Sequence, residues 1–216
     1  MSPTIVLVTA AVIGITAVVL TPSMRHLAGT DSGWLRSGLH SVLAGLGAAG
    51  AATLAHGWAE LTAFAVLALA AGLLVVIDLA VYRLPDVIVA PTYLVLFAAL
   101  TVAAATRADC DRLGRAAGAS GILALGYLAL ALVTPSGLGL GDVKLAGLLG
   151  VFLGWLGWQQ TIIGTLAAFV LSGAVAVVLL LSTSATGRTA FPFGPCMVAG
   201  AAIGAAWGPT LIAGSG

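Results

Sequence analysis

The chain consists of long apolar segments separated by short polar connections. A helix of about 20 mostly apolar residues crosses a bilayer, because it satisfies its own backbone hydrogen bonds within hydrocarbon. The alternating pattern of an outer-membrane barrel is missing from the sequence. The pattern therefore predicts an all-α, polytopic transmembrane helical bundle of about eight spans, of which the sixth is short. The expected spans are Thr4–Leu20, Leu39–Ala55, Leu61–Ala80, Val87–Ala105, Leu113–Val133, Val143–Leu156, Thr161–Leu181 and Phe191–Ile212.

Composition supports a membrane protein and argues against a nucleic-acid-binding one. Hydrophobic residues make up 61% of the 216 positions and charged residues only 7%, against roughly 25% charged residues in soluble domains. A formal net charge of +1 provides no bulk attraction for nucleic acid. We therefore expect the lipid bilayer as a partner and no nucleic acid. Because no long hydrophilic block interrupts the pattern, residues 1–216 are expected to form a single integral membrane domain.

The few charged residues lie almost entirely at the ends of the expected spans. With eight spans, one side of the membrane and its edges carry five Lys and Arg residues, and the opposite side carries three, offset by two Asp residues. This bias favours a cytoplasmic position for the first set of loops. Those loops are residues 21–38, 81–86, 134–142 and 182–190.

Two carboxylates, Asp78 and Asp142, stand out as candidates for chemistry. Asp78 lies among hydrophobic residues near the end of the third span. An acid raises the free energy of membrane insertion by about 2.5–3.5 kcal/mol at the centre of a span, and by less toward the interface. Asp142 follows Gly139-Leu140-Gly141 at the start of the sixth span. Because two spans separate the acids, both are expected at the same side of the membrane.

Paired carboxylates in a medium of low dielectric share a proton, which provides both an acid and a base for hydrolysis. Gly139 and Gly141 are expected to let the backbone turn tightly and a substrate strand approach closely. The residues alone leave other roles open for the acids: a proton relay in a transporter, an ion-pair partner or a helix cap. Cys110 and Cys196 form neither a disulfide framework nor a zinc pattern, and no metal site is expected.

Three segments resemble those of a known family. Ile77 to Asp86 resembles the first signature of the type IV prepilin peptidases, and Gly139 to Leu145 resembles the second, a GxGD motif followed by Lys and an apolar residue. Pro192-Phe193-Gly194-Pro195 resembles a further recurring segment of the family. The resemblance covers roughly residues 60–205.

This resemblance implies the fold of the GxGD membrane aspartyl proteases and cleavage of the short basic leader of prepilin-like substrates, after a glycine. The reaction would take place at the cytoplasmic face of the bacterial inner membrane. By motif position, Asp78 and Asp142 carry over as the catalytic pair, with no metal or organic cofactor. The chain resembles a short form, without the cysteine-rich N-terminal region of larger members, so N-methyltransferase activity has less support than leader cleavage.

Five residues are expected to support the pair: Gly139, Gly141, Lys144, Asp86 and Arg83. Pro85 disfavours a helical conformation at Leu84, so Asp86 is expected to start the fourth helix as its cap. Lys144 is expected to influence the protonation of Asp142 or to hold its loop. Arg83 is interpreted as an interfacial anchor rather than a substrate contact.

Two rival hypotheses accompany the peptidase. A proton-coupled or cation transporter would use the same carboxylates, but the sequence shows no convincing internal repeat of the kind many transporters have. An inactive assembly factor of a pilus or secretion machine would be supported by loss of one acid, and both are present. Elsewhere, Glu60 and His56 are expected at the membrane interface. No feature indicates an oligomeric state.

Overall fold

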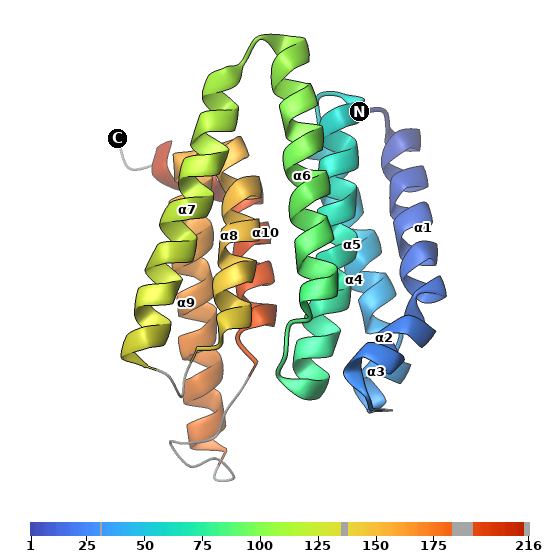
Figure 1. Cartoon of the computed structure of the whole chain (residues 1–216), viewed down its shortest axis with the longest axis vertical. Coiled ribbons are helices and arrows are strands. Elements are labelled where there is room, and N and C mark those ends of the chain that lie inside the picture. The colour runs from blue at the N-terminus through green and yellow to red at the C-terminus, as the bar shows by residue number, and fades with distance from the viewer. Residues whose placement is uncertain (31, 135–137, 183–191, 214–216) are drawn as a thin grey trace. The chain divides into compact units, whose positions relative to one another are not determined.

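The computed structural model describes residues 1–30, 32–134, 138–182 and 192–213, and every regular element in these ranges is a helix (Figure 1). The predicted all-α fold is therefore confirmed. The helices are α1 (Pro3–Val19), α2 (Thr21–Ala28), α3 (Gly33–Arg36), α4 (Leu39–Leu54), α5 (Trp58–Val81), α6 (Asp86–Arg107), α7 (Cys110–Val133), α8 (Leu140–Leu156), α9 (Trp158–Leu181) and α10 (Gly194–Ala213).

Each of the eight expected spans coincides with one helix, but not all of these helices are long enough to cross a bilayer. Among the described residues, α5, α6, α7 and α9 are long and apolar enough, and α1 with α2 makes a fifth candidate if this pair, bent by 48°, is one span. The helices α4 and α10 are apolar but shorter, and α8 has 17 residues. A polytopic bundle is thus confirmed, whereas the count of eight spans is not.

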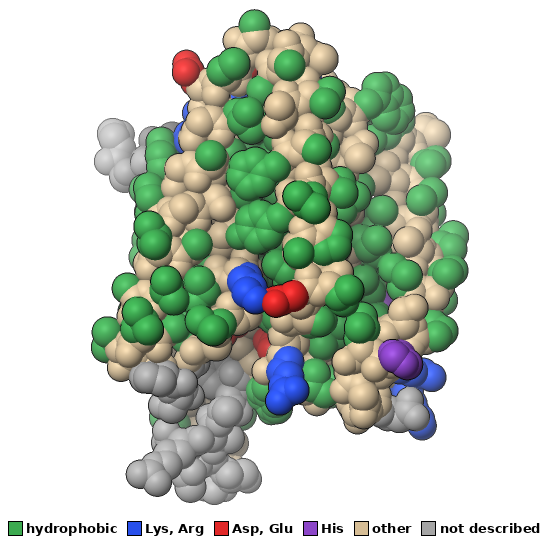
Figure 2. All heavy atoms as spheres, in the orientation of Figure 1, with side chains coloured by type: hydrophobic (Ala, Val, Ile, Leu, Met, Phe, Trp, Pro, Cys, Tyr) green, Lys and Arg blue, Asp and Glu red, His purple; other side chains and the backbone are tan. Residues whose placement is uncertain are grey.

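Many large hydrophobic side chains are exposed on the helices. Leu94 and Leu132 are each 73% exposed, for example, and Figure 2 shows few charged side chains among the hydrophobic ones on the viewed face. Exposed apolar surface of this extent is unfavourable in water, but it is what lipid chains solvate.

The chain divides into two compact units, residues 1–113 and 114–216, with the boundary in the first turns of α7. The expectation of one domain over the whole chain stays a prediction. In the first unit, α4 packs against both α1 and α5, and α6 packs against α5. Gly72 of α5 permits the contact with α4, since a Cβ there would meet the His40 carbonyl oxygen at 2.7 Å. Most of α5 is buried as a result.

The short helices α2 and α3 complete the core of the first unit at one end. Met24 of α2 and Leu35 of α3 are buried with Val76 and Ile77 of α5. These two α5 residues immediately precede Asp78. The end of α5 that carries the acid is therefore fixed by apolar packing.

In the second unit, α8 is the buried helix and packs against α9 and α10. The helices α9 and α10 approach through glycines: a Cβ on Gly200 would meet the Ala168 nitrogen at 2.5 Å and the Gly164 oxygen at 2.6 Å. A Cβ on Gly150 of α8 would meet the Ala119 oxygen of α7 at 2.9 Å. Small residues thus let these backbones pack closely, as is common between membrane helices.

Candidate active site

Asp78 lies one turn from the end of α5 and is 5% exposed. The helix ends at Tyr82, which adopts the left-handed conformation with φ 53° and whose N–H donates to the Asp78 carbonyl oxygen at 2.9 Å. The sequence predicted an acid among hydrophobic residues near the end of this helix, and Asp78 lies there. Its catalytic role stays a prediction.

Two of the expected supporting residues lie where α5 is joined to α6: Arg83 in the connection and Asp86 at the start of α6, and both are exposed. The helix α6 begins at Asp86, as expected, but Pro85 occupies the capping position and Asp86 is the first helical residue. The expectation that Asp86 caps the helix was therefore wrong by one position. An acid in the first turn still stabilises α6, because it faces the positive end of the helix dipole.

Asp142 is the third residue of α8 and is bonded to the residue that precedes the helix. The Gly139 N–H donates to Asp142 Oδ2 at 2.9 Å, and the Asp142 N–H donates to the Gly139 carbonyl oxygen at 3.0 Å. This is the back-bonding of a capping box, in which an acid at the third position satisfies the amide before the helix. The bond fixes one carboxylate oxygen and thereby orients the side chain.

The two glycines before Asp142 do not adopt the tight turn that the sequence suggested. Gly139 has φ −90° and ψ 159°, an extended conformation that any residue can adopt, and Gly141 lies within α8. A Cβ on Gly139 would make only ordinary contacts, at 3.6 Å from Asp142 Oδ2. The expectation of a special backbone conformation was therefore wrong, and the expectation that the glycines leave room for a substrate stays a prediction.

Partial burial raises the pKa of Asp142 above the ordinary value of an aspartate, although the bond from the Gly139 N–H acts in the opposite direction. Asp142 is half-buried, whereas Lys144, two residues further along α8, is exposed. A raised pKa means that this carboxyl keeps a proton to a higher pH than a fully solvated aspartate. A carboxyl with a raised pKa is a candidate for proton transfer in catalysis.

The opposite end of α8 is held by Arg115 of α7. Its Nε donates to the Gly154 carbonyl oxygen at 2.7 Å, and its Nη2 donates to the Trp155 carbonyl oxygen at 3.2 Å. These carbonyl groups lie in the last turn of α8, where no further turn of the helix provides N–H groups to donate to them. A cation there also interacts favourably with the helix dipole. Both ends of α8 are therefore tied by side-chain hydrogen bonds.

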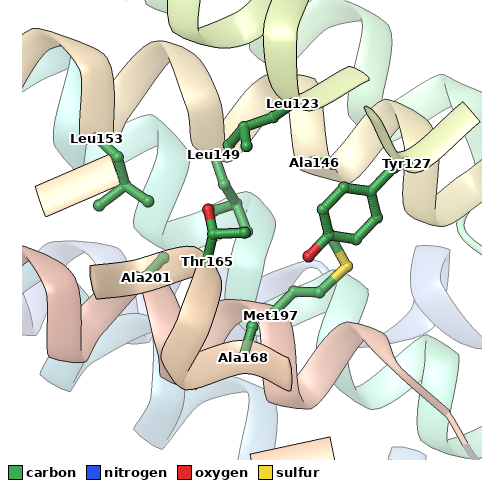
Figure 3. Close-up of a pocket in the computed structure, with 10 residues that line it drawn as sticks. Leu123, Tyr127, Ala146, Leu149, Leu153, Thr165, Ala168, Met197 and Ala201 are labelled. Atoms are coloured by element: carbon green, nitrogen blue, oxygen red, sulfur yellow. The ribbon is translucent and has the colours of Figure 1, made fainter. Parts of the chain in front are cut away.

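A small apolar pocket lies between the helices of the second unit, beside the middle and later turns of α8 (Figure 3). Tyr127 of α7 lines it, and its ring contacts those of Phe169 and Phe193 at centroid distances of 5.5 Å and 6.0 Å. Phe193 belongs to the segment before α10 that resembled a recurring family segment. That segment therefore packs against Tyr127, which lines the pocket.

The sequence did not reveal a buried ion cluster at the other end of the first unit. Glu60, in the first turn of α5, is 1% exposed and accepts from Arg107 Nη1 at 3.2 Å and from the His56 N–H at 2.7 Å. Arg112 Nη1 lies 3.5 Å from the same Glu60 oxygen that Arg107 contacts. About 27 Å of helix separates Glu60 from Asp78, so this cluster forms no part of the candidate site. Among the described residues, no group of three His, Cys, Asp or Glu could hold a metal ion.

A bundle of apolar helices whose carboxylates lie at helix ends defines a multi-pass membrane protein. The chain belongs to the type IV leader peptidase family, since the model of that family matches residues 63–181, more than half of the chain. The matched region contains Asp78 and Asp142, and the family resemblance inferred from the two signatures is confirmed.

One curated relative is a prepilin leader peptidase/N-methyltransferase from Pseudomonas putida, which is 38% identical over 97 residues. The alignment covers 41% of this chain and 33% of the relative, so the chain spans about a third of the length of that protein. No solved structure matches the chain.

Proposed function

We propose that this chain is an aspartic endopeptidase of the bacterial inner membrane that removes the leader peptide of prepilin-like or pseudopilin substrates at the cytoplasmic face. The observation that carries the proposal is the family match, which spans both candidate acids. The name of the Pseudomonas putida relative supports the same substrate class. The proposal concerns peptide cleavage alone.

The chemistry would use Asp78 and Asp142 as a pair. The ionised carboxylate accepts a proton from water while the water oxygen attacks the scissile carbonyl carbon. The protonated partner supplies the proton that the amide nitrogen needs to leave. The two proton transfers balance, so no metal or organic cofactor is required. General acid–base catalysis of this kind typically contributes about 10²–10⁴-fold to the rate.

The order of the helices supports the pairing. Asp78 lies near the end of α5 and Asp142 near the start of α8. The two intervening helices, α6 and α7, are both long and apolar enough to cross the membrane. If both cross, the chain leaves the side of Asp78 and returns to it before Asp142.

The local structure of each acid also suits the proposal. Burial of Asp78 and partial burial of Asp142 exclude the bulk water that would otherwise weaken an acid–base pair. The bond from Gly139 to Asp142 Oδ2 holds that carboxyl in one orientation. Exposed side chains of Arg83, Asp86 and Lys144 would contact the solvated leader or the lipid headgroups near the acids.

The decisive experiment is cleavage by the purified chain in liposomes. The substrate is a synthetic peptide with a basic leader, a glycine and an apolar segment. We expect D78N and D142N each to lose cleavage by about 10²-fold or more, with insertion unchanged. The matched control is D111N, which removes a charge from an exposed acid in the first turn of α7. Retained cleavage by D142N would refute the mechanism. Ion uptake without cleavage in the same liposomes would instead support the transporter.

A further inference from the structure

The helix α2 turns away from the direction of α1 by 48°. Pro22, the second residue of α2, has no N–H with which to continue the hydrogen bonds of α1. The Thr21 hydroxyl lies 2.9 Å from Nε2 of the buried His40, which fixes the start of α2 against α4. The 17 residues of α1 extend over about 25 Å, and the hydrocarbon core of a bilayer is about 30 Å thick. If α1 crosses this core, α2 begins near the depth of the lipid headgroups.

The short helices α2 and α3 are each anchored by one apolar residue and expose another. Met24 of α2 and Leu35 of α3 are buried in the core of the first unit. On the outer side, Leu27 is 46% exposed and Trp34 is 49% exposed. Tryptophan is enriched where a membrane meets water, because its ring is apolar and its N–H is polar. Exposed bulky side chains on anchored helices are suited to the boundary between headgroups and acyl chains.

The same two helices carry positive charge. Arg25 is half-buried, and His26 and Arg36 are exposed. Figure 2 shows Lys or Arg and His side chains on the surface near α2 and α3, as these helices are labelled in Figure 1. Between residues 21 and 38, the two arginines are accompanied by one acid, Asp31, which lies outside the described residues. The segment therefore has a net charge of +1, two arginines less one aspartate, and an anion is its complementary ligand.

This charged segment packs against the end of α5 that carries Asp78. The anchors of α2 and α3 belong to one apolar cluster with Val76 and Ile77, which precede Asp78 in α5. Ala80 and Val81, which follow Asp78, pack against the same cluster. Packed apolar groups move together, because interiors are dense and resist deformation. The depth at which α2 and α3 lie in the membrane therefore also determines the depth of this end of α5.

We propose that α2 and α3 form a binding surface for the headgroups of anionic phospholipids. The arginines attract the negative headgroups, while the exposed Leu27 and Trp34 enter the boundary with the acyl chains. A second copy of the chain that used this surface would bring like charges together, and a basic peptide would be repelled, so charge favours lipid. The inference goes beyond the proposed peptidase function and does not depend on it. Bound lipid would hold the Asp78 end of the first unit at the membrane surface.

The test is fluorescence quenching by brominated lipids in phosphatidylcholine vesicles that contain the full chain. Bromine on an acyl chain quenches a nearby indole ring, and the difference between the wild type and W34F isolates the signal of Trp34. Phenylalanine keeps an aromatic ring at this partly exposed position. We expect brominated phosphatidylglycerol to associate near Trp34 about fivefold more strongly, or more, than brominated phosphatidylcholine. Added salt should weaken this preference, because it screens the charges.

Two double variants separate charge from shape. R25Q/R36Q should lose the preference for the anionic lipid, whereas R25K/R36K should keep it, since the attraction requires charge rather than a guanidinium group. Equal quenching of wild-type Trp34 by the two lipids would overturn the inference, as would an unchanged preference in R25Q/R36Q. Quenching by neither lipid would also overturn it and would indicate that protein, such as a second copy, covers the surface. None of these measurements requires cleavage, so a failure of the peptidase proposal is distinguishable.

Discussion

Replacing Glu60 by glutamine should destabilise the first unit without touching the candidate acids. Glu60 is almost completely buried, whereas Arg107 and Arg112 are 33% and 22% exposed. Glutamine keeps one acceptor for the His56 N–H but removes the charge that both guanidinium groups face. Breaking a fully buried ion pair costs about 3–5 kcal/mol. Because the two arginines are partly exposed, solvent can stabilise their charges once Glu60 is replaced. We therefore expect a loss of about 2–3 kcal/mol in the free energy of unfolding.

The measurement is reversible denaturant unfolding in mixed micelles, with D111N as the control. Asp111 is exposed and also lies at the start of a helix, so its replacement should cost about 0.3–1 kcal/mol at most. The double variant E60Q/R107Q should lose less than the sum of the single variants, because both replacements break one interaction. Equal stability of E60Q and D111N would refute the conclusion that the buried cluster holds the first unit together.

Three further predictions concern helix packing and helix ends. G200A should disrupt the packing of α10 on α9, because a Cβ at this position has no room. The control G173A should be tolerated, since nothing lies within 4 Å of a Cβ there. In micelles, G200A should be less resistant to protease than G173A, and equal resistance would contradict the prediction. R115Q should cost about 1–3 kcal/mol of unfolding free energy through loss of the bonds at the end of α8, and an unchanged value would contradict the capping role. A108G should stabilise the chain by up to about 1 kcal/mol, because Ala108 ends α6 with φ 54° and glycine adopts this conformation without strain; a lower unfolding midpoint would show otherwise.

The sequence predicted the helices well wherever an apolar run ended at a strong polar or glycine signal. The fourth expected span, Val87–Ala105, differs from α6 by one residue at its start and two at its end. Residues 21–38 were expected as a loop, yet they contain α2 and α3. Their mixed polarity hid two short helices, which form because Met24 and Leu35 find buried positions against α5. Such contacts depend on tertiary structure and leave little trace in local periodicity.

Side-chain placement followed from the sequence only where one helix was involved. Asp78 near a helix end and Asp142 near a helix start were both predicted from the apolar runs. The burial of Glu60 was not, because a lone acid at a helix end usually faces the interface and its partner Arg107 is 47 positions away. The order of the helices could have indicated this pair. In a helical hairpin, the start of one helix lies beside the end of the next, so Glu60 at the start of α5 and Arg107 at the end of α6 come to the same end.

The Asp142 side chain has two roles in the proposed site: it accepts the hydrogen bond from the Gly139 N–H at the start of α8, and it is one of the two candidate catalytic acids. A group that gains a proton becomes a poorer acceptor, so any protonation of Asp142 would also loosen the first turn of α8. Replacing Asp142 by alanine would remove the hydrogen-bond acceptor together with the acid. A loss of activity could then result from fraying of the first turn of α8. Asparagine retains an oxygen that the Gly139 amide can reach. An asparagine variant is consequently the better inert form for trapping a bound peptide with the helix start intact.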